Sequence, residues 1–286
     1  MAKNLEHLLP ISWKYQIHEW LKEDIPSFDI AGYVVGEKFE RASLICKSHG
    51  ILAGKPFVNE IFNFLSCSVS WCVDEGTEIV GDYVTVASVD GPARNILLGE
   101  RLALNILARC SGIASECFKL NQKKRAKAWN GVISGTRKTT PGFRLVEKYG
   151  MIVGGCDPHR MDLSSLVMLK DNHIWSQGSI ANSVKAVKEI CKFALKIEVE
   201  CRNFEEALEA CESGADIVML DHVKPGSIAD VKSLKEKHPM VIVEVSGGIN
   251  ENNIEEYMIE SVDVVSTGAI TQSFKCVDFS LKINKK

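Results

Sequence analysis

The spacing of apolar positions changes near the middle of the chain and becomes a regular alternation. From Gly131 onward, short apolar runs typical of strands alternate with stretches whose apolar residues recur at helical spacing. This alternation indicates parallel strands joined by right-handed helical crossovers. The expected strands are 132–137, 165–170, 196–200, 216–221, 241–246 and 262–267, and the expected helices are 143–149, 180–193, 203–213, 227–236 and 251–259.

These units predict an α/β fold with a β/α barrel as the catalytic domain, over residues 116–274. A complete barrel has eight strands, whereas this pattern supplies six, so we expect an incomplete barrel of about six strands. The tail 275–286 breaks the rhythm, and we expect it to join the first domain.

Residues 1–115 have the pattern of a separate N-terminal domain. Short strand candidates interrupted by a helix favour an antiparallel sheet with helical cover, an α+β sandwich. The strands are expected at 42–46, 69–73 and 83–89, and the helices at 17–23 and 56–65.

A long helix, from Pro92 to about Lys127, is expected to join the two domains. Gly112 stands in its middle and weakens the helix by about 1 kcal/mol relative to Ala. Either a close approach of another backbone or a simple kink would account for this glycine.

The composition narrows the class of protein. The chain has 286 residues, of which 45% are hydrophobic, and a net charge of -3, which gives no bulk attraction to nucleic acid or anionic membranes. None of the ten cysteines forms a Cys-x-x-Cys pair or a zinc spacing, which indicates a reduced, cytoplasmic compartment. No signal peptide and no apolar run of the roughly 18 residues needed for a membrane span is evident. We therefore expect neither nucleic acid nor membrane as a partner.

Residues suited to chemistry stand at or just after the ends of the predicted barrel strands. A β/α barrel gathers these strand ends on one face and builds its active site there. The pattern therefore predicts one cavity for a phosphorylated, anionic substrate that is held partly through a metal ion. The residues are Arg137, Lys138, Lys170, Glu200, Asp221, Ser246, Gly247, Gly248 and Gly268.

Basic residues are concentrated between Ser134 and His173. Arg137 and Lys170 directly follow apolar strand cores, where an unpaired cation is costly, which favours a binding site over a solvated basic surface. Arginine forks match carboxylates in two-point contact, so several converging forks would recognise a dicarboxylate. Lys170 is also a candidate Schiff-base nucleophile, as in barrel aldolases.

Two carboxylates and two glycine turns complete the predicted rim. Glu200 and Asp221 would bind sugar hydroxyls or Mg²⁺, which prefers few carboxylates together with phosphate oxygens. The alternative is that both only pair with rim cations and hold structure. The turn at Gly247-Gly248 lets backbone amides approach a phosphate at a helix start.

At these residues the chain resembles the quinolinate phosphoribosyltransferase family, also called nicotinate-nucleotide pyrophosphorylase (carboxylating). The matching blocks span most of residues 95–270, and the N-terminal domain matches more loosely. They are GERLALNILARCSGIAS, SGTRKTTPGFRLVEKYG, GGCDPHRMDLSSLVMLKDNHI, KIEVE, DIVMLD, VIVEVSGGI and the glycine of STGAI.

The resemblance implies a pentosyltransferase of de novo NAD biosynthesis. Quinolinate and phosphoribosyl pyrophosphate would give nicotinate mononucleotide, pyrophosphate and CO₂, with Mg²⁺ as cofactor. It also implies the residue roles. Lys138, Lys170, Glu200 and Asp221 would be catalytic, with Mg²⁺ on the last two directly or through water; Arg101, Arg137, His159 and Arg160 would hold the quinolinate carboxylates; and Ser246, Gly247, Gly248 and Gly268 would take the 5′-phosphate.

Arg101 lies in the long helix, outside the barrel units. In the family an arginine here reaches the site of a neighbouring subunit, which implies a homo-oligomer with the dimer as its unit and a hexamer in the animal type. The chain departs from the family pattern at His222, where Asn is frequent, and at Gln272, where His is frequent. Both changes would alter hydrogen bonds of the loops.

Two further readings remain open. A transferase for nicotinate itself is the nearest, although a monocarboxylate needs fewer cations than this rim offers. The cluster from Lys123 to Lys127 has the charge of a nucleic-acid patch, but no aromatic platform accompanies it, which favours a solvated helix end.

Overall fold

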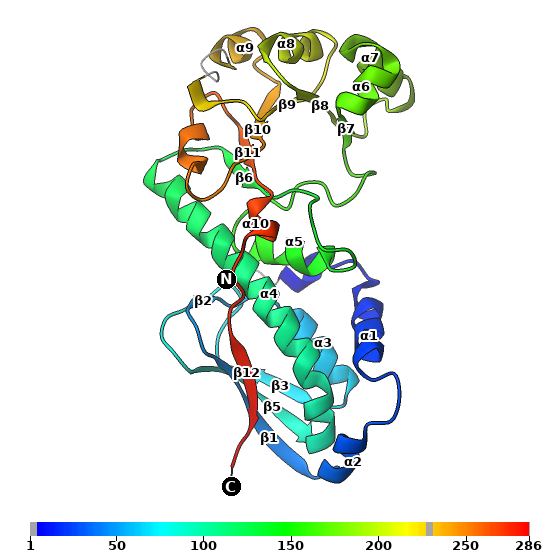
Figure 1. The fold of residues 1–286 in the computed structure, drawn as a ribbon, viewed down its shortest axis with the longest axis vertical. Coiled ribbons are helices and arrows are strands. Elements are labelled where there is room, and N and C mark those ends of the chain that lie inside the picture. The colour runs from blue at the N-terminus through cyan, green and yellow to red at the C-terminus, as the bar shows by residue number, and fades with distance from the viewer. Residues whose placement is uncertain (1–4, 227–230, 286) are drawn as a thin grey trace. The chain divides into compact units, whose positions relative to one another are not determined.

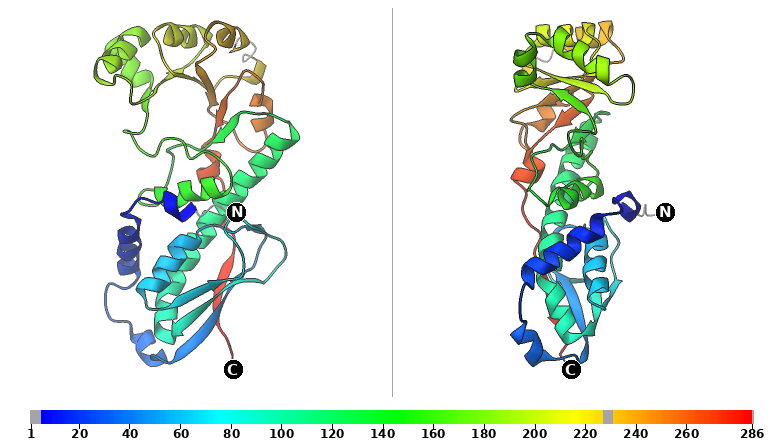
Figure 2. Two further views of the ribbon diagram at one scale, coloured as in Figure 1. Left: turned by 180° about the vertical axis from the view of Figure 1, so that it is seen from behind. Right: turned by 90° about the vertical axis from the view of Figure 1, so that its right-hand side faces the viewer.

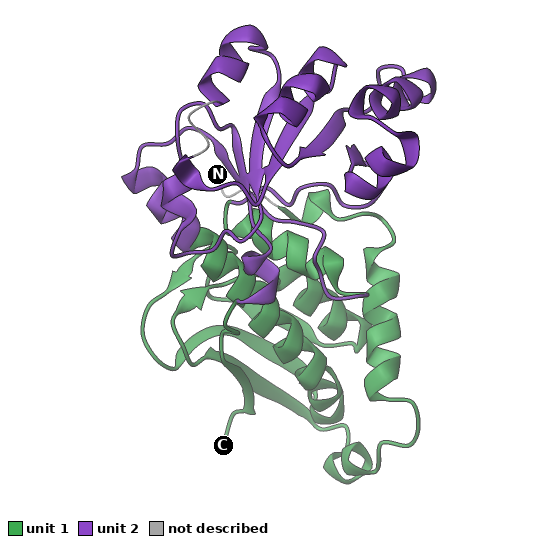
Figure 3. Cartoon of the chain, turned by 45° about the horizontal axis from the view of Figure 1, so that its top comes forward, with its two compact units in different colours: residues 1–118, 142–155, 274–286 green, residues 119–141, 156–273 purple. Residues whose placement is uncertain are grey.

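The computed structural model describes residues 5–226 and 231–285, which divide into two compact units (Figure 3). Unit 1 contains the chain up to Phe118, residues 142–155 and the segment from Phe274 onward; unit 2 contains residues 119–141 and 156–273. The segment 142–155, expected in the barrel domain, belongs to unit 1. The reason is packing, because Val146 and Tyr149 of this segment are buried in the core of unit 1.

Unit 1 is built on a four-stranded antiparallel sheet in the order β12-β1-β5-β3. The C-terminal tail supplies β12, which pairs with β1 from Ala42↔Ile283 to Cys46↔Phe279 (Figure 1). A separate pair, β2-β4, completes the strands of this unit. The strands are β1 (Phe39–Cys46), β2 (Gly50–Ile51), β3 (Ser68–Trp71), β4 (Glu78–Ile79), β5 (Val84–Pro92) and β12 (Phe279–Ile283).

The helices of unit 1 bury apolar side chains against this sheet. Phe57, Ile61 and Phe62 of α3 join Leu44 of β1 and Ile106 of α4 in one hydrophobic core. Pro56 stands in the first turn of α3, where no backbone donor is needed. The helices are η1 (Leu5–Leu8), α1 (Trp13–Asp24), α2 (Ile30–Val35), α3 (Lys55–Phe64), α5 (Arg144–Val153) and α4 (Ala93–Ala126), which continues into unit 2.

Unit 2 is built on a six-stranded parallel sheet in the order β6-β11-β10-β9-β8-β7. The strands carry apolar and mostly β-branched residues, and both faces are buried, as parallel sheets require. All but β8 are shorter than expected, and all stand at the expected places. They are β6 (Val132–Ser134), β7 (Val167–Leu169), β8 (Ile197–Cys201), β9 (Ile217–Asp221), β10 (Ile242–Ser246) and β11 (Val264–Ser266).

The helices of unit 2 follow the strands as predicted, with exceptions at the ends. Side-chain caps start two of them, since Ser179 accepts a hydrogen bond from the Asn182 amide and Asn203 from the Glu206 amide. Helices α6, α7 and α8 lie side by side on one side of the sheet (Figures 1 and 2). They are α6 (Asp171–Gln177), α7 (Ile180–Ile190), α8 (Phe204–Glu212), α9 (Val231–Lys237), η3 (Ile254–Tyr257) and α10 (Ala269–Gln272).

Three differences from the sequence-based expectation concern these helices. The stretch 251–259 forms a 3₁₀ turn, η3, instead of an α-helix, and α6 and α10 were not expected. The start of the helix expected over 227–236 falls on residues 227–230, which lie outside the described residues. None of these differences moves a strand.

The prediction of an incomplete barrel is confirmed. β6 and β7, the first two strands of unit 2, stand at opposite ends of the sheet order, whereas a closed barrel would pair them. Beyond β6, the sheet continues only as an isolated bridge from Ser134 to Asp157. Within residues 5–226 and 231–285, no helix combines the length and the apolar character that a membrane span requires.

Candidate active site

A cavity of about 250 Å³ lies in unit 2, at the carboxyl ends of the parallel strands. Because all six strands run in the same direction, their ends meet at one edge of the sheet. The structure brings eight of the predicted site residues together around this cavity. Its lining consists of Thr136, Arg137, Lys138, His159, Arg160, Met168, Lys170, Glu200, Met219, Asp221, Ser246 and Ser266.

The guanidinium group of Arg160 is held in place by a backbone carbonyl and a methionine sulfur. Its Nη1 donates to the carbonyl oxygen of Leu166 at 3.2 Å, and its Nη2 lies 3.3 Å from the sulfur of Met168. Burial and the nearby charge of Arg137 lower the pKa of Arg160. Two guanidinium groups close enough to repel each other make a strong receptor for an acid with two carboxylates.

The loops that carry the first two cations follow β6. Arg137 and Lys138 stand beyond the strand end, and the carbonyl of Lys138 accepts a 2.7 Å hydrogen bond from the hydroxyl of Thr271. This contact joins the loop after β6 to α10, the helix after β11, because the two strands are neighbours in the sheet. The Lys138 side chain is thereby kept beside Gly268, where an added Cβ would lie 3.1 Å from Lys138 Cδ.

Both predicted carboxylates are paired at the rim. Lys170 Nζ donates to Glu200 Oε2, and His222 Nδ1 lies 2.7 Å from Asp221 Oδ2. These pairs fit the hypothesis that the two carboxylates only hold structure. They fit the binding hypothesis equally well, because a site without substrate would pair them in the same way. Two carboxylates at one rim, with room for other oxygen ligands in the cavity, fit the few-carboxylate coordination that Mg²⁺ prefers.

The glycine turns have the backbone geometry that a phosphate loop needs. Gly247 and Gly248 have φ values of 91° and 69°, in the left-handed region that favours glycine. A Cβ at Gly247 would lie 2.5 Å from Nδ1 of His222, whose backbone amide donates to the carbonyl of Ser246. Of the predicted turn residues, Ser246 lines the cavity, while Gly247, Gly248 and Gly268 are not among the lining residues.

Arg101 is the one predicted side chain of the site that belongs to unit 1. It is exposed on α4 and is not among the residues that line the cavity.

Sequence reasoning missed several residues around the cavity. Thr136, Met168, Met219 and Ser266 line it; they lie within the matching sequence blocks, but none carries a charge that marked it as a site residue. Ser266 donates to the Ser246 hydroxyl at 2.9 Å and so supports the glycine turn. A second omission concerns the interior of the sheet, because Glu198 and Glu244 are buried carboxylates in strands β8 and β10.

Glu198 is fully buried, and burial together with the neighbouring Glu244 raises its pKa to about 8. The signal was present in the sequence, since VIVEV places Glu244 inside an otherwise apolar strand and KIEVE places Glu198 in the middle of a predicted strand. A glutamate is rarely fully buried unless it is paired with another group.

A larger hollow, of about 670 Å³, is also present in unit 2. It is lined by residues such as Val132 and Asp263, which stand at the amino ends of β6 and β11. In β/α barrels the amino-terminal face serves stability and the carboxyl-terminal face serves catalysis. The smaller cavity is therefore the candidate active site.

Comparisons with known proteins agree over nearly the whole chain. Residues 29–111 match the family model described as Quinolinate phosphoribosyl transferase, N-terminal domain, and residues 113–282 match the corresponding C-terminal domain. Both matches support the resemblance that the sequence blocks indicated.

Relatives and solved structures extend this result. The nicotinate-nucleotide pyrophosphorylase (carboxylating) of Dictyostelium discoideum is 48% identical over 285 residues, covering 94% of this chain and 95% of that protein. The human protein of the same name is 47% identical over 287 residues, covering 100% and 96%. The structure of the nicotinate-nucleotide pyrophosphorylase from Francisella tularensis superposes with a TM-score of 0.88 at 33% identity, covering 96% and 98% of the two chains. The chain therefore belongs to the quinolinate phosphoribosyl transferase family.

Proposed function

We propose that this chain transfers the phosphoribosyl group of phosphoribosyl pyrophosphate to quinolinate and removes one carboxylate. The products are nicotinate mononucleotide, pyrophosphate and CO₂, as a step of de novo NAD biosynthesis in the cytoplasm. The observation that carries this proposal is the convergence of Arg137, Lys138, Arg160 and Lys170 on one cavity beside Glu200 and Asp221. Family membership supports it, because the relatives named above carry the name of this activity.

The charges of the cavity suit each part of the reaction. Arg137 and Arg160, with His159, face the two carboxylates of quinolinate and orient its ring nitrogen toward the anomeric carbon of the ribose. Lys138 and Lys170 face the pyrophosphate, and Glu200 and Asp221 hold the ribose hydroxyls. The 5′-phosphate lies on the turn at Ser246 to Gly248 and on the loop at Gly268.

The reaction needs no protein nucleophile. The bond from the anomeric carbon to pyrophosphate breaks while the ring nitrogen bonds to that carbon, and the positive charge on the ribose is tolerated by the nearby carboxylates. The pyridinium ring then accepts the electron pair of the breaking bond to the 2-carboxylate, CO₂ leaves, and a proton takes its place. Positioning of the two substrates accounts for most of the acceleration.

Mg²⁺ is the proposed cofactor, with Glu200 and Asp221 as its protein ligands, directly or through water. When bound, it neutralises negative charge on the pyrophosphate. Removal of divalent cations with a chelator should abolish product formation, and added Mg²⁺ should restore it. Full activity in the presence of the chelator would exclude this cofactor.

A product assay tests the function itself. Purified protein with quinolinate, phosphoribosyl pyrophosphate and Mg²⁺ should form nicotinate mononucleotide and release one CO₂ per product. Nicotinate in place of quinolinate separates the nearest alternative, a transferase for the monocarboxylate. Product from nicotinate alone would refute the proposal.

Two other readings lose support from the contacts. Lys170 is ion-paired with Glu200, and an ion-paired ammonium group is a poor Schiff-base nucleophile. Lys123 forms an ion pair with Glu255 at 3.0 Å, and Lys127 donates to the Glu255 carbonyl, so these cations serve the contacts of a helix end.

We also propose a homo-oligomer whose unit is a dimer, assembled into a hexamer, in which Arg101 completes the site of its partner. This proposal has a direct test in mixed oligomers. Arg101→Ala and Arg137→Ala should each be nearly inactive alone. Dissociated and reassembled together, they should recover about a quarter of the wild-type activity, because half of the dimers then hold one intact site. No recovery would place both arginines in the same subunit's site.

A further inference from the structure

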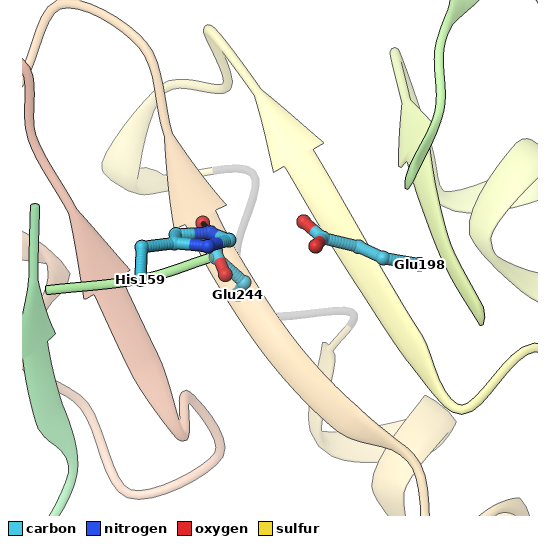
Figure 4. A group of neighbouring side chains, drawn as sticks. All are labelled: His159, Glu198 and Glu244. Carbon is cyan, nitrogen blue, oxygen red and sulfur yellow. Dashed lines mark ion pairs between the residues drawn. The ribbon is translucent and has the colours of Figure 1, made fainter. Parts of the chain in front are cut away.

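Three ionisable side chains lie close together beside the cavity. Sequence reasoning named His159 but missed the two glutamates. His159 comes from the segment between α5 and β7, Glu198 from the middle of β8 and Glu244 from the middle of β10. Their possible ligand atoms all lie within 4.8 Å of one another, with the carboxyl groups turned toward the imidazole ring (Figure 4). Glu198 and Glu244 are 0% and 3% exposed and do not line the cavity.

His159 is fixed at several points. Its backbone amide donates to Asp157 Oδ1 at 2.6 Å, and its Nδ1 accepts a 2.7 Å hydrogen bond from the backbone amide of Arg160. Its Nε2 lies 3.4 Å from Glu244 Oε1. Because Nδ1 acts as an acceptor, the ring proton belongs on Nε2, which faces the carboxylate.

The backbone at His159 is also strained. Its φ of 57° lies in the left-handed region, which a residue with a side chain adopts only when its surroundings enforce it. The contacts to Asp157, Arg160 and Glu244 supply that enforcement. The strained turn sets the direction in which the next side chain, Arg160, leaves the backbone.

Glu198 lies beside this pair without a contact of its own. Neither of its carboxyl oxygens has a hydrogen-bond partner among the described residues. Burial and the neighbouring Glu244 raise its pKa, which favours the neutral form of Glu198. The contact that reaches the cavity is therefore the one between Glu244 and His159.

We infer that Glu244 is a positioning residue for the diacid: from inside the sheet it holds the His159 ring, and with it the strained turn that carries Arg160, in the geometry that receives the acid. The inference rests on the proposed function, since it assigns a further part of the same site. Glu244 does not touch the substrate. It acts through the imidazole ring.

The same three side chains have the composition of a metal site, and the surroundings decide against it. The charges of His159, Arg160 and Lys170 all act on Glu198. A further cation at this point would be repelled by Arg160 and Lys170.

The test is a kinetic double-mutant cycle with Glu244→Gln, His159→Ala and the double variant. Glutamine keeps the volume of the buried side chain but removes its charge. Glu244→Gln should raise the KM for quinolinate about tenfold, as expected for the loss of one buried charge contact to His159. The KM for phosphoribosyl pyrophosphate should change less than about twofold, because the clamp holds only the acid. In the His159→Ala background, Glu244→Gln should have no further effect on the quinolinate KM.

The chain offers a matched control. Glu60 is a buried carboxylate of unit 1 whose Oε1 lies 3.1 Å from Nε2 of His18, and neither residue lines the cavity. Glu60→Gln removes the same charge from the same kind of pair and should leave the quinolinate KM unchanged. Glu244→Asp is the second variant if Glu244→Gln does not fold. It draws the carboxyl group back from Nε2 of His159 by one methylene and should raise the quinolinate KM in the same direction.

Three kinetic outcomes would overturn the inference. They are an unchanged quinolinate KM in Glu244→Gln, an equal rise of both substrate KM values, and effects of Glu244→Gln and His159→Ala that simply add. A copurified metal whose removal reproduces the Glu244→Gln phenotype would also overturn it. These outcomes differ from failure of the proposed function, in which the wild-type protein forms no nicotinate mononucleotide.

Discussion

The glycine in the middle of α4 offers a quantitative test of the packing in unit 1. A Cβ at Gly112 would lie 2.4 Å from the carbonyl oxygen of Lys275 and 2.9 Å from Cδ2 of Phe274. Next to this point the amide of Val277 donates to the carbonyl of Ala108 at 3.1 Å. The close backbone approach therefore explains the glycine, and a kink is not needed.

Two opposing terms decide the effect of Gly112→Ala. Alanine in a helix interior stabilises the folded chain by about 1 kcal/mol relative to glycine. Against this, the new methyl group overlaps a backbone carbonyl, which cannot rotate away as a side chain can. Overpacking of this kind costs about 1–3 kcal/mol. A contact of 2.4 Å with backbone places the cost in the upper part of this range, about 2–3 kcal/mol. We therefore expect the free energy of unfolding to fall by about 1–2 kcal/mol, the sign opposite to helix propensity.

Denaturant unfolding of the wild type and the variant measures this difference. Gly99→Ala is the matched control on the same helix, because its Cβ would meet side-chain atoms, Phe62 Cε1 at 2.8 Å and Leu65 Cδ1 at 3.0 Å. These can move, so the control should be destabilised less than Gly112→Ala. If Gly112→Ala is as stable as the wild type, the tail does not pass over α4 as described.

Two further predictions concern the site. Arg137→Ala and Arg160→Ala should each raise the quinolinate KM by about 10- to 100-fold and lower turnover, since each removes a charge-assisted contact; unchanged steady-state kinetics in both would show that the acid binds elsewhere. The pKa of Glu198, raised from 4.5 to about 8, predicts that the folded state holds a proton that the unfolded state releases. The free energy of unfolding should therefore decrease as the pH rises from 4.5 to 8. Urea unfolding at pH 6 and at pH 8 measures this pH dependence, which Glu198→Gln should reduce. An equal pH dependence in the wild type and the variant would contradict the raised pKa.

The strands of unit 2 were predictable because each is an apolar run of strand length bounded by polar turns. Their order in the sheet followed from the handedness of βα connections, and their ends therefore indicated the cavity. Lys170, Glu200 and Asp221 stand at such ends and line it. The limit of this reasoning appears at α5, where an amphipathic helix has the same pattern whichever core it joins. Val146 and Tyr149 pack in unit 1, and this partner is a property of tertiary structure.

Small elements escaped prediction for a different reason. The helix α10 has only four residues, fewer than the apolar periodicity needs to be visible, yet Thr271 in it holds the loop of Lys138. The departures from the family pattern at His222 and Gln272 were visible in the sequence, but their contacts were not. His222 contacts Asp221 and Gly247, and Gln272 lies against Gly268, so both substitutions stand directly at the rim.

The two glutamates of β8 show why position along a strand matters as much as residue type. Glu198 and Glu200 are separated by one residue, so both side chains leave the strand on the same side. Glu200 stands near the carboxyl end, lines the cavity and pairs with Lys170. Glu198 stands one step deeper, where no water reaches it and where the charges of Arg160 and Glu244 act on it instead. The same type of side chain is thus open to the cavity at one position and enclosed in the sheet two residues earlier, because the depth of burial determines which groups it can contact.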